Sequence, residues 1–366
     1  MRNDIYMLWL SALVHQVGSR KLNALLDTFG NANGVFNAPL AQLEQAMTGA
    51  TLALKHITHT RNFEYIETLL RQMEAKGIAY ISRDNIRFPT LLKEIPDPPL
   101  GIFFMGTLPA NNTEKVAIIG SRKCSEYGLL SARHLARPLA AAGVVIVSGM
   151  ARGVDSMAHR GALEGKGVTM AVLGCGVDIC YPAENKQLKE DICKNGCVLS
   201  EYAPGVRPAP GFFPARNRII SGLSRGIIVT EAGLRSGTLI TVDQAQEQGR
   251  EVLAVPGNIS SKLSQGTNQL IRDGAYPIAD HQDVLHILGI TPQSKPDNIT
   301  RIGQPTQTKL APDEKRVYDC LSMEPISFDM LVDMANIDIG RLHLICTSLE
   351  LKGLAKKLPG ARYIAS

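Results

Sequence analysis

The sequence predicts an α/β fold: a Rossmann-like, doubly wound parallel sheet, extended at one edge, between an N-terminal helical domain and a C-terminal winged-helix domain. Short apolar segments alternate with helical patterns from residue 116 to about residue 288. The first of them, Val116–Ile119, breaks at a glycine and leads through a helical pattern to a second apolar segment, Val144–Val147. Fully apolar strands in this order are typical of a parallel sheet buried on both faces.

The chain of 366 residues is too long for one ordinary hydrophobic core. We expect a helical domain over residues 1–75, the Rossmann-like domain over 76–290, a linker over 291–311 and the winged-helix domain over 312–366.

The first 75 residues carry apolar side chains at helical spacing, interrupted at Gly18 and Gly30. The segment Val17–Leu22 resembles half of a helix–hairpin–helix module, which can grip a DNA backbone through helix N-termini. The alternative is a small bundle, SAM-like or similar, that only packs. The packing bundle is favoured because residues 1–115 carry a charge of only 11 − 10 = +1, which is little for a DNA-binding module.

Further strands are expected on both sides of this first unit. Segments 78–81 and 102–105 flank the proline-rich run Ile95–Pro99 and predict an added edge on the main sheet. The remaining apolar segments complete a parallel sheet of about six strands, at 168–173, 197–199, 226–230 and 251–255.

The turn Gly120-Ser121-Arg122 ends the 116–119 strand, at the sheet edge where α/β folds bind ligands. It offers a glycine for close approach, a hydroxyl donor and a guanidinium that binds phosphate through two parallel bonds. The alternative is a strand end with an incidental surface arginine. The fingerprints G-x-G-x-x-G and G-x-x-x-x-G-K-[ST] do not occur in the sequence, which argues against a dinucleotide cofactor and P-loop hydrolysis.

Two further turns bring cations to the same edge. Arg152 follows the 144–147 strand, and Lys186 lies in the first turn of an expected helix, where a lysine opposes the helix dipole and is more useful to a ligand. Asp155 and His159 share one helix face. A catalytic acid–base pair is conceivable, but an N-capping aspartate and a structural histidine are the favoured interpretation.

The segment 212–224 combines two aromatic residues, two arginines and an asparagine. Aromatic rings that stack bases beside arginines that hold phosphates are typical of single-strand binding, and the candidates are Phe213, Arg216, Asn217 and Arg218. Two core phenylalanines with surface arginines would give the same pattern. Further along, Ser236, Gly237 and Thr238 place backbone N–H groups and two hydroxyls at a helix start, a generic anion site.

The C-terminal region shows three short helical patterns and two strand candidates flanking Pro359-Gly360, which together predict a winged helix. Its charge over residues 312–366 is 7 − 8 = −1, and Arg341 is the one basic residue of the would-be recognition helix. A protein-contact role therefore fits this domain better than DNA reading.

Bulk composition gives a net charge of +5, 45% hydrophobic and 20% charged residues, as in a soluble globular protein. No apolar run is long enough for a membrane span or has the features of a secretory signal, and we expect a cytoplasmic protein without membrane insertion. The seven cysteines show no paired C-x-x-C spacing, so we expect reduced, mostly buried thiols and no metal.

The order of these motifs resembles the DNA-processing protein A family, also called DprA or Smf. The resemblance covers about 200 residues, from Phe88-Pro89 to Asp280, and its other motifs are Ser148-Gly149, Tyr181-Pro182, Ser200-Glu201-Tyr202, Glu231-Ala232-Gly233, Val255-Pro256-Gly257-Asn258 and the run Gly266–Ala275.

This resemblance implies a dimeric bacterial protein that binds single-stranded DNA during natural transformation and is not an enzyme. It implies that the protein shields the incoming strand, displaces or coexists with single-strand-binding protein and loads the RecA recombinase, without a cofactor. The family's DNA-contacting arginine falls on Arg122, and a contacting lysine falls on or beside Lys186. A homodimer is expected through residues 260–290, which are rich in apolar side chains.

The competing interpretation is an enzyme resembling the nucleotide phosphoribohydrolases, which share a glycine–threonine phosphate turn. The turn Gly233–Thr238 is present, but Thr241 stands where the catalytic acid would be required. Binding is therefore favoured over catalysis. A nicotinamide dehydrogenase is disfavoured because the dinucleotide fingerprint is missing.

Overall fold

The computed structural model describes residues 2–292, 310–322, 325–352 and 354–365. The chain divides into two compact units, Met1–Gln293 and Ser294–Ser366. The expected linker, 291–311, lies almost entirely outside the described residues.

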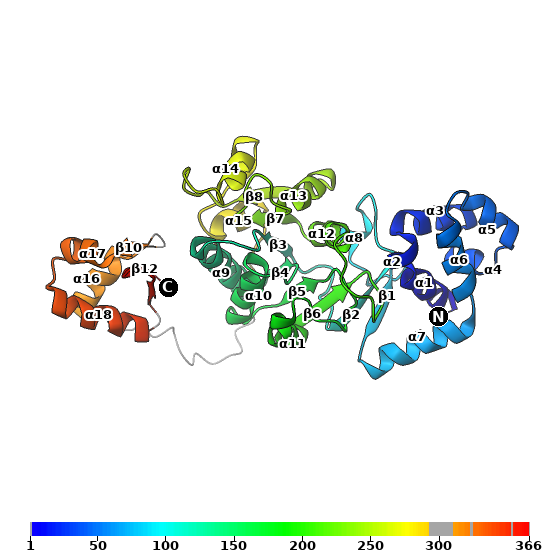
Figure 1. Ribbon diagram of the computed structural model, residues 1–366, viewed down its shortest axis with the longest axis horizontal. Helices are drawn as coiled ribbons and strands as arrows, with labels where there is room; N and C mark the ends of the chain where they lie inside the picture. The colour runs from blue at the N-terminus through cyan, green and yellow to red at the C-terminus, as the bar shows by residue number, and fades with distance from the viewer. Residues whose placement is uncertain (1, 293–309, 323–324, 353, 366) are drawn as a thin grey trace. The chain divides into compact units, whose positions relative to one another are not determined.

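The first unit is built on a nine-stranded sheet with the order β1-β2-β6-β5-β4-β3-β7-β8-β9 (Figure 1). All neighbouring pairs from β6 to β9 are parallel, whereas β1 and β2 run antiparallel at one edge, as expected for an added edge. The strands are β1 Ala79–Ser82, β2 Gly101–Gly106, β3 Lys115–Ile119, β4 Val145–Ser148, β5 Thr169–Val172, β6 Gly196–Ser200, β7 Gly226–Val229, β8 Glu251–Ala254 and β9 Tyr276–Pro277. The short β9 is an addition to the expected strands.

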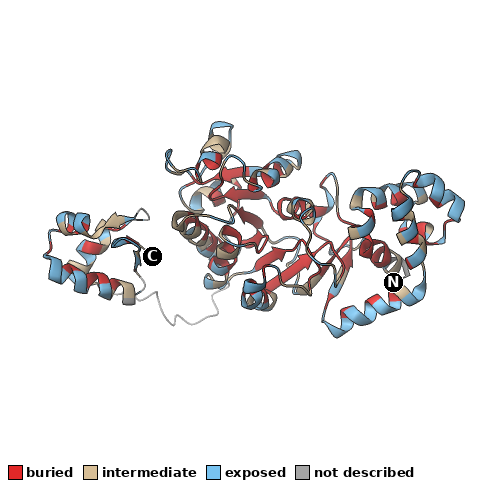
Figure 2. Cartoon of the chain, in the orientation of Figure 1, coloured by how far each residue is buried: buried red, intermediate tan, exposed pale blue. Residues whose placement is uncertain are grey.

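Helices cover both faces of this sheet because successive strand residues point to opposite sides. Val116 and Ile118 of β3 pack in one buried cluster with α9 and α10, and Ala117 and Ile119 pack in another with α12 and α13. Figure 2 shows the strands as the buried centre of this unit. The helices after the sheet begins are α8 Thr90–Lys93, α9 Glu126–Ala141, α10 Val154–Glu164, α11 Lys186–Asn195, α12 Phe212–Gly222, α13 Thr238–Glu247, α14 Gln265–Arg272 and α15 His281–Ile287.

The strand order reverses between β3 and β7. From β3 the chain proceeds outward through β4, β5 and β6, and then returns to the other side of β3 as β7. The carboxyl ends of two such neighbours open a crevice that is the common ligand site of open α/β sheets. The turn that carries Arg122 and the turn that carries Ser236 therefore face one another across this crevice.

Seven helices precede the sheet in the described part of the chain: α1 Arg2–Ala12, α2 Val14–Val17, α3 Ser19–Phe29, α4 Ala32–Asn37, α5 Leu40–Ala46, α6 Thr51–Thr60 and α7 Phe63–Ala75. Of these, α1 and α7 pack against the β1–β2 edge. The core of the seven helices includes the fully buried Trp9 and extends to Leu100 and Tyr202 of the later chain. The hydroxyl of Ser19, the first residue of α3, donates to Asp97 Oδ2 at 3.0 Å. The segment compared above with a DNA-gripping module thus meets a carboxylate of the same chain.

Over its described residues, the second unit contains three helices and a small antiparallel sheet of order β10-β12-β11, the arrangement of a winged helix. The elements are α16 Pro312–Cys320, β10 Ile326–Ser327, α17 Phe328–Ala335, α18 Ile339–Leu351, β11 Ala355–Leu358 and β12 Arg362–Ala365. They enclose a core of their own around Leu331, Leu342 and Leu349.

The seven cysteines are free thiols, but only Cys175, Cys197 and Cys346 are buried, so the expectation of mostly buried thiols is wrong. None of the described helices is long and apolar enough to cross a membrane. Within the described ranges, no group of three or more histidine, cysteine or acidic side chains is placed to hold a metal ion.

Candidate nucleic-acid interface

A groove of about 700 Å³ lies at the carboxyl edge of the sheet, where β3 and β7 are neighbours. Its walls come from the turns after β3, β4 and β7 and from the start of α12. The lining residues include Ser121, Arg122, Lys123, Asp155, Tyr181, Pro210, Phe213, Arg216, Asn217, Ser236, Gly237, Thr238 and Thr241. A smaller pocket adjoins it and shares Arg122, Tyr181, Phe213 and Arg216 while adding Arg152 and Gly174.

The turn after β3 is held close to its neighbours by glycines. A Cβ added to Gly120 would lie 2.6 Å from Val154 Cγ2 and 3.0 Å from the Glu231 carbonyl oxygen. Gly153 has a φ of +77°, and a Cβ there would lie 2.5 Å from the Ser121 carbonyl oxygen. Glycine at these two positions therefore lets three turns converge. The Ser121 N–H donates to the Glu231 carbonyl at 2.8 Å, which fixes the turn across the switch point.

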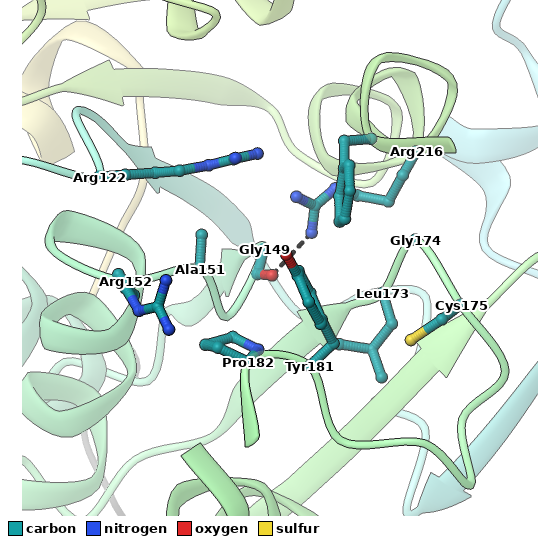
Figure 3. A pocket seen from close by; sticks show the side chains of 11 residues that line it. Arg122, Gly149, Ala151, Arg152, Leu173, Gly174, Cys175, Tyr181, Pro182 and Arg216 are labelled. Carbon is teal, nitrogen blue, oxygen red and sulfur yellow. Dashed lines mark hydrogen bonds between the residues drawn. The ribbon is translucent and has the colours of Figure 1, made fainter. Parts of the chain in front are cut away.

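Arg122 extends from this turn over an aromatic surface. Its Cζ lies 5.3 Å from the centroid of the Phe213 ring. The Phe213 ring in turn lies 5.5 Å from the Tyr181 ring, with an interplanar angle of 33°. Arg122 is exposed, so its guanidinium can rest on the ring and still reach a phosphate. Figure 3 shows the side chains of Arg122 and Arg216 reaching into the smaller pocket from opposite sides.

Arg216 belongs to the floor of the groove. It is 5% exposed, and its Nη1 donates to the carbonyl oxygen of Gly149 at 2.7 Å (Figure 3) and to that of Val172 at 2.5 Å. A Cβ at Gly149 would lie 2.3 Å from Nη1, so a glycine is required for this contact. Burial lowers the pKa of Arg216, and the Asp155 carboxylate opposes that shift. Arg216 therefore contributes positive charge from below rather than an extended side chain.

Asp155 is the one acidic residue among those that line the groove. Its Oδ2 accepts from the Ala151 N–H at 3.3 Å, and burial raises the pKa of its carboxyl group against the lowering effect of Arg216. The N-cap of α10 is Gly153, so the interpretation of Asp155 as an N-cap is wrong.

His159 does not line the groove. It is fully buried, its Nδ1 lies 2.7 Å from Thr169 Oγ1, and burial lowers its pKa to about 3. The favoured interpretation of this histidine as structural agrees with that geometry. Asp155 and His159 consequently do not form an acid–base pair at the surface of the groove.

Asn217 lines the groove and accepts from Arg216 Nε at 3.1 Å. Arg218 lies elsewhere, and its assignment to the DNA site is corrected here. Its Nη2 donates to both carboxylate oxygens of Glu201, at 2.6 and 2.7 Å, and its Nε lies 3.4 Å from Asp97 Oδ2. This buried ion pair joins α12 to the region beneath the N-terminal helices, so Arg218 has a structural role.

Arg152 and Lys186 differ in their relation to the site. Arg152 lines the smaller pocket and is exposed, and its Nη2 donates to Glu184 Oε2 at 2.7 Å. Lys186 begins α11, as expected, and is exposed. It lines neither the groove nor the smaller pocket.

Ser236, Gly237 and Thr238 form the opposite wall, with Gly237 as the N-cap of α13. The Ser236 hydroxyl donates to Thr238 Oγ1 at 2.9 Å and accepts from the Thr238 N–H at 3.2 Å. Two of the expected hydrogen-bond donors, the Ser236 hydroxyl and the Thr238 N–H, are therefore engaged within the turn itself.

Several lining residues were not among the expected site residues, including Lys123, Tyr181, Pro210 and Thr241. Lys123 directly follows Arg122, and Tyr181 belongs to a motif already noted. The aromatic side chain in the Tyr181-Pro182 motif is a signal in the sequence that could have identified Tyr181 as a site residue. Pro210 carries no comparable signal.

Comparison with family models gives a match in each of the two units. A family model described as DNA recombination-mediator protein A matches residues 79–289, and the DprA winged helix domain matches residues 303–361. The chain is 33% identical to Protein Smf of Synechocystis sp., with 99% of each chain covered. It is 45% identical to DNA processing protein DprA of Streptococcus pneumoniae, over 57% of this chain and 77% of that relative.

Solved structures of DNA processing protein A from two bacteria are among those similar to this chain. DNA processing protein A of Streptococcus pneumoniae gives a TM-score of 0.68 at 36% identity, covering 78% of this chain and 97% of that chain. DNA processing protein A of Helicobacter pylori gives 0.53 at 34% identity, covering 58% and 95%. The latter work describes a single-stranded DNA binding mode of that protein.

Proposed function

This chain belongs to the DNA recombination-mediator protein A (DprA/Smf) family, and from that premise we propose that it binds single-stranded DNA in the groove between β3 and β7. The observation that carries the proposal is Arg122 resting on Phe213 at the mouth of this groove. A guanidinium beside a stack of aromatic rings can hold a phosphate while the rings receive a base.

The charge of the groove supports the same proposal. Its lining residues include three cations, Arg122, Lys123 and Arg216, and one acid, Asp155. Asp155 is buried beside Arg216, whose positive charge compensates it, so an excess of two positive charges faces the solvent. Such a surface attracts a phosphate backbone without reading its sequence.

The similarity to solved and named relatives supports the ligand class. The Helicobacter pylori relative is described as binding single-stranded DNA, and the matching family is named for recombination mediation. We therefore assign this chain to DNA processing in recombination. We further propose that the protein shields the strand, exchanges with single-strand-binding protein and loads RecA. We also propose that it acts as a homodimer in the cytoplasm.

The nucleotide phosphoribohydrolase alternative would use the same groove. Thr241 lines it at the position where that class of enzyme requires an acid. The acid that does line the groove, Asp155, accepts a backbone hydrogen bond and neighbours Arg216, an arrangement that stabilises the turn after β4. A binding role is therefore favoured over hydrolysis.

The test of the proposed function compares ligands on the full chain. Fluorescence anisotropy with oligothymidine and with a duplex of equal length, at several salt concentrations, should give tighter binding of the single strand and an affinity that falls steeply with salt. A parallel assay for release of a free base from nucleoside monophosphates addresses the enzymatic alternative. Equal affinity for single strand and duplex, or base release, would contradict the proposal.

A further inference from the structure

A second groove, of about 550 Å³, lies between the N-terminal helices and the loop that leads into α12. Its walls come from α1, α2 and α7 on one side and from residues 203–207 on the other. The lining residues are Ala12, His15, Tyr65, Thr68, Leu69, Gln72, Ala203, Pro204, Gly205, Val206, Arg207 and Phe212. None of these lining residues is acidic.

One short segment separates the two grooves. In the run 207–213, Pro210 and Phe213 line the first groove, whereas Arg207 and Phe212 line the second. This segment contains no acidic residue, and Pro210 and Gly211 at its crest are exposed. A Cβ added to Gly211 would meet no atom within 4 Å, so the crest is open enough for a strand to pass over it.

The second groove offers the same chemistry as the first. Arg207 is an exposed cation, and Tyr65 and Phe212 are partly exposed aromatic side chains at its wall. The Phe212 ring is held by a stack on Tyr202, with a centroid distance of 4.3 Å and an interplanar angle of 29°. Aromatic faces beside a guanidinium suit a nucleotide, whose base stacks while its phosphate binds the cation.

The loop wall of this groove is fixed by its own contacts. The Gly205 N–H donates to both carboxylate oxygens of Asp178, at 2.9 and 3.1 Å, and the Gly176 N–H donates to the Val206 carbonyl at 2.8 Å. Lys76, at the end of α7, donates to Asp178 at 2.6 Å and balances the charge of that carboxylate. The two sides of the groove are thereby tied to each other, which preserves its shape.

We propose that this second groove holds further nucleotides of the same single strand after it leaves the first groove across the segment 207–213. The inference rests on the proposed function, since it takes the strand from the first groove. It gives the N-terminal helices a role in strand binding through α7 and the end of α1.

The test uses the full chain and two oligothymidines, one of about six and one of about twenty nucleotides, a range typical of single-strand sites. Arg207→Glu and the uncharged, groove-filling Thr68→Trp should each weaken binding of the long oligonucleotide by about tenfold. Both should leave the affinity for the short one within about twofold. Arg71→Glu, an equal charge change on α7 outside the lining residues, is the matched control and should leave both affinities near wild type.

A second readout locates the strand directly. With 5-iododeoxyuridine in the long oligonucleotide, irradiation should crosslink Tyr65 or Phe212, and the short oligonucleotide should crosslink neither. Wild-type affinity of Arg207→Glu and Thr68→Trp for the long oligonucleotide, or crosslinks confined to the first groove, would overturn the inference. Failure of the proposed function itself would be distinct, because the wild-type chain would then not bind the short oligonucleotide.

Discussion

The Arg122 guanidinium lies over the Phe213 ring, with Cζ 5.3 Å from the ring centroid. The two residues are far apart in sequence and meet because the turn after β3 and the start of α12 converge at the carboxyl edge of the sheet. The contact orients the long arginine side chain before any ligand arrives. A preorganised cation loses less side-chain entropy on binding a phosphate.

Replacing Arg218 should destabilise the first unit without entering the groove. Arg218→Ala leaves the buried Glu201 carboxylate without its partner, and breaking such a pair costs about 3–5 kcal/mol. Urea unfolding followed by the fluorescence of Trp9, the only tryptophan and a core residue of this unit, measures the loss. The control is Arg225→Ala, whose exposed pair with Glu114 should contribute less than about 1 kcal/mol. Equal losses in the two variants would refute the structural role of Arg218.

Removing the partner of Arg152 should strengthen DNA binding. Glu184→Gln deletes a negative charge beside the smaller pocket and releases the Arg152 guanidinium for a phosphate. Exposed ion pairs contribute about 0.2–1 kcal/mol, so the affinity for oligothymidine should rise about two- to fivefold at low salt. Glu164→Gln, which removes the partner of Arg133 on α9 and α10, is the control and should change little. An unchanged or weaker affinity in Glu184→Gln would show that Arg152 does not meet the strand.

Self-association is expected through residues 260–290. Ile278 and Val284 of this segment are buried in the protomer's own core, so the candidate surface is reduced to partly exposed residues such as Ile271. Sedimentation at micromolar concentration should give a dimer, and Ile271→Glu should give a monomer because a charge would be buried at the contact. Ile86→Glu, at a residue 94% exposed, should remain dimeric. A wild-type monomer at all micromolar concentrations would contradict the dimer.

Removal of the second unit should leave single-strand binding nearly intact. The winged-helix region carries a charge of 7 − 8 = −1 over residues 312–366, whereas a module that tracks phosphates needs the opposite sign. Truncation after residue 292 should therefore keep the oligothymidine affinity within a few fold, as measured by anisotropy. A hundredfold loss would show that this unit contacts the strand.

The sequence was sufficient to predict the parallel sheet, its added edge and the winged helix, because strand length, apolar runs and glycine turns are local signals. The antiparallel direction of that edge is known only from the structure. The sequence could not separate Arg216 from Arg218. The two lie two positions apart on α12 and therefore point to different sides of that helix, one to the groove and one to Glu201. The side of α12 that faces the groove depends on strand order and on the packing of the N-terminal helices. Neither can be predicted from the local sequence pattern.

The same limit applies to the aromatic pair and to Lys186. Phe213 faces the first groove and Phe212 the second, although they are successive residues in the first turn of α12. Lys186 was correctly expected at a helix start, yet that start does not reach the lining of the groove. A helix terminus near the sheet edge predicts the direction of the helix dipole's electric field, but it does not predict the distance from that terminus to a ligand.

The affinity of Arg122→Ala for oligothymidine is the most direct test of the central claim, that the groove between β3 and β7 holds a phosphate of single-stranded DNA. Loss of this charge-assisted contact should weaken binding about ten- to a hundredfold for every sequence and lower the magnitude of the salt slope by about one. Arg122→Lys should recover only part of the affinity, because an ammonium group cannot form two parallel bonds. The control Arg133→Ala, at a partly exposed arginine of α9, should bind like the wild type. An Arg122→Ala variant that melts like the wild type and still binds oligothymidine with wild-type affinity would contradict the account.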